Sequence, residues 1–314
     1  MPQPTIDILM PVFQGEKFLP DQLASLEAQT YDNFRLLIRD DGSTDNSAEI
    51  VRAFADKSSL DVVLLPGESR LGVVESVNRL IEASRAAYLM FADQDDIWLP
   101  EKIAASLERM KQAQQQLGCQ MPLMVFTDKQ VVDEAGKLLH GSYFEYQRLN
   151  PQRLSLGQLL VQNVPSACTM LVNRPLMNLC GTIAPEAVMH DAWLSLLAVT
   201  AGRLIYLPQA TVQYRQHRHN YYGARRYGWG YFRHRIGAGL QQIRLRFLRN
   251  VNQAESFERC YREILSPEHR WVLAEFAGLP QYTPLKRLAI LRRCGIAKTS
   301  LRRNIGMWGL MLCL

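Results

Sequence analysis

The chain has 314 residues, of which 47% are hydrophobic and 21% charged, and its formal net charge is +6. This composition is typical of a folded protein with one large core or two modest ones, and it excludes a disordered chain. The six cysteines stand far apart without a C-x-x-C pair, so their spacing supports neither a zinc site nor a disulfide framework. Reduced thiols are typical of the cytoplasm, where we expect this protein.

The first 130 residues alternate apolar, β-type runs with helical patterns. This alternation predicts an α/β fold with a mostly parallel, Rossmann-like sheet and helices on both faces. The expected strands are residues 6–12, 34–39, 62–65 and 87–92, and the expected helices are residues 18–29, 47–55, 73–83 and 100–115. The N-terminal stretch lacks a basic region, so we interpret it as the first strand and not as a signal peptide.

The pattern changes near residue 120, where shorter strands mix with helices. We expect a nucleotide-binding half at residues 1–120 and an acceptor half at 121–222, together forming one domain, followed by a basic helical region at 223–314. A segment rich in glycine and aromatic residues, Tyr221 to Gly230, is typical of a linker. The expected elements of the acceptor half are strands at 123–127, 168–173, 204–207 and 211–215, and helices near 155–162 and 189–200.

Polar clusters follow three of the expected strands, at residues 11–14, 40–45 and 93–96. In parallel α/β sheets, ligands bind beyond the carboxyl ends of the strands. The three clusters therefore form the expected binding edge of the sheet.

The run Asp93-Gln94-Asp95-Asp96 places three carboxylates in four residues. Their mutual repulsion is relieved by a divalent metal, and Mg²⁺ or Mn²⁺ prefers such oxygen ligands together with substrate phosphates. The alternative is that Asp95 or Asp96 caps the helix that follows. Spacing alone leaves both interpretations open.

The run Asp40-Asp41-Gly42-Ser43-Thr44-Asp45 also has two interpretations. Its residues are typical of a turn and helix cap before the expected helix at 47–55. Alternatively, one of its carboxylates accepts a hydrogen bond from a nucleobase. The presence of two acidic loops on one expected sheet favours the functional interpretation of each.

Taken together, these motifs, the Gly72 to Asn78 stretch and Phe91-Ala-Asp-Gln-Asp-Asp-Ile-Trp-Leu-Pro100 resemble glycosyltransferase family 2, which has the GT-A fold. The likeness extends to about residue 222. Within that family, the segments 163–173, 189–193 and 214–217 look like the branch described as rhamnosyltransferases.

The resemblance implies that Pro11 and Phe13 line a nucleoside pocket and that Asp41 contacts the base. It implies that Asp93 and Asp95 hold the metal. Asp96 then remains as the helix cap. The further residues expected to bind the nucleotide sugar are Asn78, Gln94, Arg215 and His217.

Family members are inverting enzymes, which need a base for the acceptor hydroxyl, and our candidate is Asp191. It precedes an apolar helical run, so the alternative is that it only caps that helix. In the Tyr214-Arg215-Gln216-His217 run, Arg215 suits a leaving diphosphate, and His217 suits either a metal or a phosphate. The loop 219–223 is expected to become ordered when the donor binds.

The resemblance therefore implies an inverting, metal-dependent transferase that moves a sugar, plausibly rhamnose from a dTDP donor, to a hydroxyl of a surface glycan or lipid-linked glycan precursor. A UDP-hexose or UDP-N-acetylhexosamine donor is the alternative on the same fold. An inactive nucleotide-sugar-binding scaffold is the alternative of another class. We expect no nucleic-acid partner, because the chain lacks base-stacking aromatics spaced along a sheet.

Charge is divided unevenly along the chain. Residues 203–314 contain 20 Lys and Arg against 5 Asp and Glu, a net charge of +15, whereas residues 1–202 carry −9, from 16 against 25. At the end of the chain, basic residues precede an apolar tail that is too short to span a membrane. Two interpretations stay open: the tail lies on the anionic inner face of the plasma membrane, or it packs on the protein as a helical cap.

Overall fold

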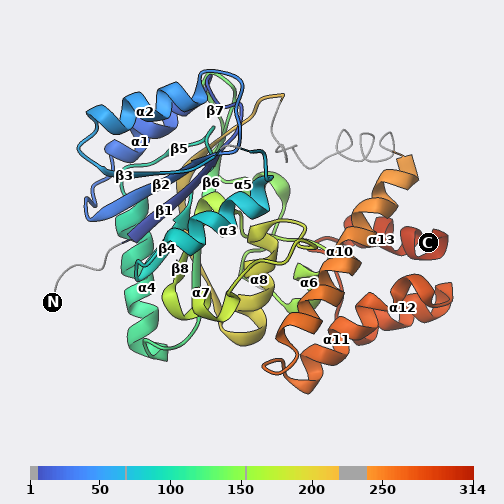
Figure 1. The fold of residues 1–314 in the computed structure, drawn as a ribbon. Helices are drawn as coiled ribbons and strands as arrows, with labels where there is room; N and C mark the ends of the chain where they lie inside the picture. Colours follow the sequence, from blue (N-terminus) through green and yellow to red (C-terminus); the bar gives the residue numbers. More distant parts are fainter. Residues whose placement is uncertain (1–5, 68, 153, 219–238) are drawn as a thin grey trace. The chain divides into compact units, whose positions relative to one another are not determined.

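The computed structural model describes residues 6–67, 69–152, 154–218 and 239–314 (Figure 1). It forms two compact units. Unit 1 contains Met1–Tyr143, Pro165–Ile183 and Arg203–Gly223, and unit 2 contains Phe144–Val164, Ala184–Gly202 and Ala224–Leu314. Two segments that the sequence assigned to the acceptor half thus group with the C-terminal helices. The expected linker at 221–230 and the expected mobile loop at 219–223 lie outside the described residues.

Unit 1 is built on one mixed sheet of nine strands, with the order β3-β2-β1-β4-β8-β6-β9-β5 and β7 paired to β6. The first four strands are those the sequence predicts, to within one residue at each end, and the short strand β5 was not predicted. The nine strands are β1 Ile6–Val12, β2 Phe34–Asp40, β3 Asp61–Leu65, β4 Tyr88–Phe91, β5 Ile97–Trp98, β6 Leu123–Val132, β7 Leu138–His140, β8 Met170–Asn173 and β9 Arg203–Arg215.

Strand direction brings distant parts of the sequence to one edge of this sheet. β1 is parallel to β2 and to β4. β8 is antiparallel to both β4 and β6, and β9 is parallel to β6, so β6 and β9 run in the same direction as β4. The carboxyl ends of these five strands therefore open on the same edge, where ligands bind in such sheets.

Helices cover both faces of the sheet. One face buries the alternate β1 residues Ile6, Ile8, Met10 and Val12 in a core with side chains of α1, α2 and α4. The helices α3 and α7 pack on β1 and β8, and they contribute nothing to that core. The bounds are α1 Leu19–Glu27, α2 Ser47–Lys57, α3 Val73–Ala83, α4 Lys102–Leu117 and α7 Arg174–Cys180.

The second half of the sheet differs from the sequence-based expectation in its strand lengths. The two expected strands at 204–207 and 211–215 are one strand, β9, and β6 continues five residues beyond Thr127. The pairing of β6 with β9 shifts register at Asp128. Pro208 and the polar run Asp128-Lys129-Gln130 at this irregularity hide the strands from an apolar pattern.

Unit 2 is helical. Trp193 of α8 is fully buried against α10, where its indole N–H donates to the Tyr261 hydroxyl at 3.0 Å and its ring packs edge-on against Phe257. Among the described helices, none combines the length and the apolar content that crossing a membrane requires. The helices are α5 Tyr143–Gln147, which starts in unit 1, α6 Leu156–Leu159, α8 His190–Ala201, α10 Gly239–Tyr261, α11 Pro267–Ala277, α12 Pro284–Arg293 and α13 Leu301–Cys313.

A buried lysine lies in the core of unit 1. Lys102 opens α4 with no exposed surface, and its Nζ lies 4.4 Å from the centroid of the Trp98 ring and makes no hydrogen bond to the described residues. Burial lowers the pKa of Lys102 to about 8, even though Cys168 and Asp96 act to raise it. The folded protein therefore binds this proton more weakly than the unfolded chain does.

We predict that Lys102→Met raises the free energy of unfolding at pH 7 by about 3 kcal/mol, since one pKa unit corresponds to about 1.4 kcal/mol. Between the folded pKa of about 8 and the ordinary lysine value, only the unfolded chain holds the proton, so wild-type stability rises with pH. The difference in the free energy of unfolding between Lys102→Met and the wild type, measured by urea titration, should therefore decrease over that pH range. A variant less stable than wild type at pH 7 would show that the ammonium has a stabilising partner.

Candidate active site

The acidic loop 93–96 leaves the carboxyl end of β4 at the binding edge of the sheet. Asp93, Gln94 and Asp95 are half-buried, whereas Asp96 is fully buried. The loop thus presents some carboxylates toward solvent and turns one inward.

Asp95 meets the end of β9. His217 Nε2 lies 2.8 Å from Asp95 Oδ2, and the two side chains are 6% and 18% exposed. The imidazole also stacks on Phe18, just before α1, with ring centroids 4.5 Å apart. This arrangement joins a carboxylate and an imidazole from residues 122 positions apart, as the common strand edge predicts.

Arg215 connects the acidic loop to other segments of unit 1 by hydrogen bonds. Its guanidinium is buried and donates to the Asp95 carbonyl at 3.2 Å, to the Glu134 carbonyl at 2.8 Å and to the Asp21 carboxylate at 2.7 Å. Its backbone N–H donates to Asp96 Oδ1 at 3.3 Å. These contacts make Arg215 a positioning residue, and the diphosphate contact expected for it stays a prediction.

Asp96 does not cap a helix, so that part of the sequence interpretation is wrong. The short strand β5 follows it, and α4 begins only at Lys102 with Glu101 as its N-cap. Burial, and then the charges of Asp95 and Asp93, raise the pKa of Asp96 well above the usual range. The side chain belongs to the interior of the site and favours its neutral form.

Lys129 of β6 is a second buried cation beside the acidic loop, and the sequence analysis missed it. Its Nζ donates to Ser166 Oγ at 3.0 Å and lies 3.6 Å from the centroid of the Tyr214 ring. Burial alone would lower the pKa of Lys129, but the acidic groups around it, including Asp96, raise it above the ordinary lysine value. The signal in the sequence was a lysine between the apolar runs of one strand.

Two sets of side chains are candidates for a divalent cation. Ligand atoms of Asp93, Asp96 and Cys168 lie within 4.8 Å of one another. Burial raises the pKa of the Cys168 thiol well above its usual range, and a protonated thiol beside a neutral Asp96 does not suit Mg²⁺ or Mn²⁺. The second set is Asp95 with the His217 imidazole, whose oxygen and nitrogen atoms suit such an ion, and the half-buried Asp93 lies two residues earlier in the same loop.

Gln94 ties the acidic loop to the loop after β1. Its side-chain oxygen accepts from the Phe13 N–H at 2.7 Å, and its amide donates to the Phe13 carbonyl at 2.8 Å. Gly15 allows this approach, since a Cβ there would lie 2.8 Å from the Gln94 side chain. Gln94 thereby fixes the backbone of Phe13, a residue expected to line the nucleoside pocket, and Pro11 lies two residues earlier within β1.

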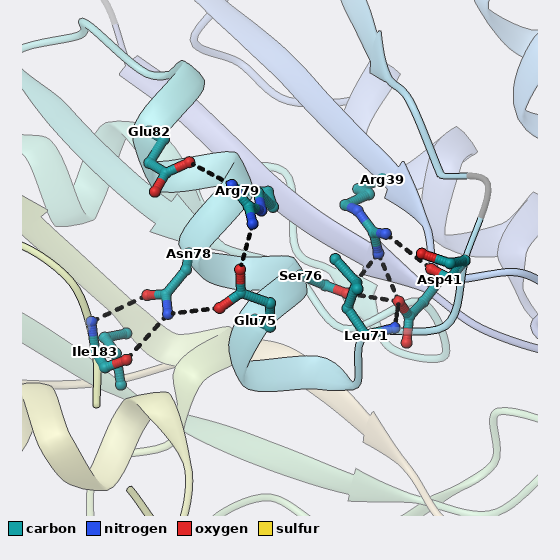
Figure 2. A network of polar contacts seen from close by, with 10 residues as sticks. Arg39, Asp41, Leu71, Glu75, Ser76, Asn78, Arg79, Glu82 and Ile183 are labelled. Atoms are coloured by element: carbon teal, nitrogen blue, oxygen red, sulfur yellow. Dashed lines mark hydrogen bonds and ion pairs between the residues drawn. The ribbon is translucent and has the colours of Figure 1, made fainter. Parts of the chain in front are cut away.

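Asp41 anchors the second acidic loop (Figure 2). Its Oδ1 accepts from Arg39, the Ser76 hydroxyl and the Leu71 N–H, whereas among the described residues its Oδ2 accepts from the Gly72 N–H alone. Burial acts to raise the pKa of Asp41, but these hydrogen bonds outweigh it and hold the pKa below the usual range. A carboxylate oxygen with one donor can accept another, so Oδ2 retains capacity for a ligand N–H.

A cation also lies over the expected base-stacking residue. The Arg70 guanidinium carbon is 4.1 Å from the centroid of the Phe13 ring. Arg70 precedes the residues whose N–H groups bind Asp41, so the same network positions it.

The Asn78 side chain makes its hydrogen bonds within unit 1 and holds two segments of that unit together (Figure 2). Its side chain is buried, accepts from the Ile183 N–H at 3.0 Å and donates to the Ile183 carbonyl at 3.0 Å and to Glu75 at 3.3 Å. Both amide donors are thus used within unit 1, where they hold the segment after α7 to α3. The nucleotide contact expected for Asn78 stays a prediction.

Asp191 belongs to unit 2, in the first turn of α8. Met189 is the N-cap of this helix, so Asp191 is not its cap. Its Oδ1 accepts from the Ala192 N–H at 2.6 Å, and the positive end of the helix dipole stabilises its carboxylate there. Its role as a base stays a prediction.

We predict that Arg215→Met lowers the free energy of unfolding by about 2 kcal/mol or more, because the charge-assisted hydrogen bonds from a buried guanidinium to the Asp95 and Glu134 carbonyls are lost. Asp21→Asn is the matched control, because it weakens only the contact to a carboxylate that is 59% exposed, and it should cost less than about 1 kcal/mol. Urea titrations compare the two. Equal losses would mean that Arg215 acts mainly through its ion pair and not through the loop carbonyls.

The sequence of the chain is similar to those of known bacterial glycosyltransferases. The chain is 24% identical over 192 residues to the UDP-Glc:alpha-D-GlcNAc-diphosphoundecaprenol beta-1,3-glucosyltransferase WfgD of Escherichia coli, over 61% of this chain and 69% of WfgD. It is 35% identical over 112 residues to an uncharacterized glycosyltransferase of Haemophilus influenzae, over 36% of this chain and 44% of that protein.

Solved structures share the fold. Residues 1–349 of S. aureus TarS in complex with UDP-GlcNAc superpose with a TM-score of 0.57 at 16% identity, over 92% of this chain and 90% of that one. The mannosyltransferase PcManGT from Pyrobaculum calidifontis, in complex with GDP-Man and Mn²⁺, gives 0.53 at 15% identity, over 93% and 86%. The mixed α/β architecture expected from the sequence is confirmed as that of GT-A glycosyltransferases, with a helical C-terminal region.

The family model described as glycosyl transferase family 2 matches residues 7–169, which contain the strands β1 to β6 and both acidic loops. This match covers more than half of the chain. The protein therefore belongs to glycosyl transferase family 2.

Proposed function

We propose that this glycosyltransferase transfers a sugar, with metal assistance, from a nucleoside diphosphate donor to a hydroxyl of a lipid-linked glycan precursor. The observation that carries the proposal is the pairing of Asp95 with His217 at the carboxyl edge of the sheet, in the loop that also holds Asp93 and beside the Phe13 and Asp41 loops. A cation site next to a nucleoside-sized set of contacts suits a donor that contains both a base and a diphosphate.

In this proposal the donor base lies near Phe13 and Pro11. The Phe13 ring offers a stacking face, and Asp41 Oδ2, with the Gly72 N–H as its donor among the described residues, would accept a base N–H as well. Arg70 now covers the Phe13 ring, so it would move aside or stack on the far face of the base. The pairing of Gln94 with Phe13 holds this pocket at a fixed distance from the acidic loop.

Asp93, Asp95 and His217 would hold Mg²⁺ or Mn²⁺, which neutralises the diphosphate as it leaves. Arg215 keeps the Asp95 backbone in place, and Phe18 fixes the imidazole plane of His217. Because the protein supplies a rigid frame, these ligands need little rearrangement when donor and metal bind.

Asp191 is the proposed base of an inverting displacement. The acceptor oxygen attacks the anomeric carbon, its proton passes to the Asp191 carboxylate, and the bond from the anomeric carbon to the diphosphate oxygen breaks. The position of Asp191 supports this role, because the side chain lies in the first turn of α8 and is only half-buried, so its carboxylate stays in contact with solvent.

Two donor classes remain as proposals. A dTDP-rhamnose donor follows from the motifs of the second half of the domain. A UDP-hexose or UDP-N-acetylhexosamine donor is favoured by the relatives, since WfgD is named for UDP-Glc and TarS was solved with UDP-GlcNAc. The name of WfgD also supports a lipid diphosphate acceptor.

We predict that a UDP or dTDP donor raises the melting temperature in the presence of Mn²⁺ and does so much less in EDTA, because a ligand stabilises the state that binds it. Asp95→Ala should remove this dependence on Mn²⁺. Asp21→Ala is the control, since Asp21 contacts Arg215 and is no proposed ligand. Equal donor shifts with and without Mn²⁺ in the wild type would refute metal assistance, and no shift with any donor would refute the transferase proposal.

We predict that Asp191→Asn lowers kcat by about 10² to 10⁴, the usual contribution of a general base, with donor affinity unchanged. The amide cannot accept the proton but preserves the shape of the side chain. Initial rates and donor titrations on the same preparation separate the two effects. Parallel loss of donor binding would indicate a structural role for Asp191 instead.

A further inference from the structure

The last helix of the chain, α13, has two different apolar faces. Its inner face is buried within unit 2 and consists of Arg303, Met307, Leu310 and Met311. Its outer face, defined here as Leu301, Ile305, Trp308 and Leu312, is 67%, 56%, 42% and 55% exposed. The spacing of four, three and four residues places these side chains in one stripe along the helix.

This outer face is unusual for the surface of a folded protein. A helix packed on a protein normally turns charged or polar residues toward water, but residues 305–314 contain none that is charged. The small residues Gly306 and Gly309 are exposed between the large ones, so residues 305–314 offer no long polar side chain to shield the stripe. Exposed apolar patches of this kind mark interaction surfaces.

The charge of the C-terminal segment indicates the kind of partner that suits the outer face. Residues 276–314 contain seven Lys and Arg and no Asp or Glu. Two of the seven are buried and bind backbone carbonyls. Arg287 donates to the Met311 and Leu314 carbonyls, and Arg303 donates to the Gln147 carbonyl. The cations that remain on the surface are Lys286, Arg292, Arg293 and Arg302, with Lys298 half-buried.

We propose that the outer face of α13 docks on an anionic lipid bilayer, with its four apolar side chains among the headgroups and the surface cations near lipid phosphates. The 13-residue helix is about 20 Å long at about 1.5 Å per residue, too short to span the hydrocarbon core. It therefore lies in the plane of the interface. Tryptophan, here Trp308, is enriched at that depth.

A second copy of the chain fits this surface less well. Pairing two outer faces would bring two basic, acid-free segments together, and like charges repel. An anionic bilayer offers both an apolar layer and compensating charge. The proposal goes beyond the transferase reaction, because none of its residues belongs to the proposed donor or metal site.

Vesicles of phosphatidylcholine mixed with phosphatidylglycerol, and of phosphatidylcholine alone, test the proposal by cosedimentation of the full chain. Wild type should bind the mixed vesicles more tightly, and Trp308→Glu should weaken that binding at least about tenfold. Leu117→Glu is the matched control, at a leucine 41% exposed on α4, and should change binding less than about twofold. If Trp308→Glu melts early, Ile305→Gln with Leu312→Gln replaces it.

Charge reversal tests the second half of the proposal. The double variant Lys286→Glu, Arg302→Glu should weaken binding to the mixed vesicles at least about tenfold, since each cation near the surface contributes about 1 kcal/mol. The control double variant Arg52→Glu, Lys57→Glu, at exposed positions of α2, should leave it unchanged. Equal effects of the two pairs would mean that general charge, and not this face, attracts the lipid.

Fluorescence locates the contact. Brominated lipids should quench the tryptophan fluorescence of the wild type more than that of Trp308→Phe. This variant keeps an apolar side chain at position 308 and should still bind the vesicles. Equal quenching would overturn the proposal. So would a wild type that is dimeric by sedimentation equilibrium and becomes monomeric in Trp308→Glu with vesicle binding unchanged, because the outer face would then bind a second copy.

Discussion

Three carboxylates within four residues repel one another, and the geometry of the site depends on how the protein offsets that repulsion. Part of the repulsion is removed because the buried Asp96 favours its neutral form. Arg215 holds the loop by the Asp95 carbonyl, and Lys129 lies in an aromatic setting beside the buried Asp96. The protein thus buries one carboxyl group of the loop and leaves Asp93 and Asp95 half-buried at the edge of the sheet.

The loops around the site are held to one another by hydrogen bonds from a side chain of one loop to backbone atoms of another. Gln94 pairs with both polar groups of Phe13, and Asp41 accepts the N–H groups of Leu71 and Gly72. Such bonds fix where a loop runs, whatever ligand is bound. They hold four loops that the sequence separates in two fixed pairs, so a nucleoside diphosphate would meet contacts already in position.

Much of this frame could be predicted from the sequence, because the period of the apolar residues reports strands and the rule on strand ends reports the binding edge. The Asp96 assignment failed because spacing does not show that a short strand, β5, separates the loop from α4. Lys129 was missed because a charge inside a strand interrupts the apolar pattern. For Arg215 the residue type pointed to an anion, but only the fold shows that its donors meet carbonyls of the same unit.

The basic tail shows why charge counts alone could not choose between a packed cap and a lipid-facing surface. In the sequence nothing distinguishes Arg287 and Arg303 from the other basic residues of the tail. In the structure, both guanidinium groups donate hydrogen bonds to backbone carbonyls inside unit 2. Their contacts anchor the end of α13 and the face that carries Arg303, and this packing decides which apolar residues stay outside. The two interpretations are therefore compatible, because the packing that makes α13 a cap also holds Ile305, Trp308 and Leu312 in a fixed row toward solvent.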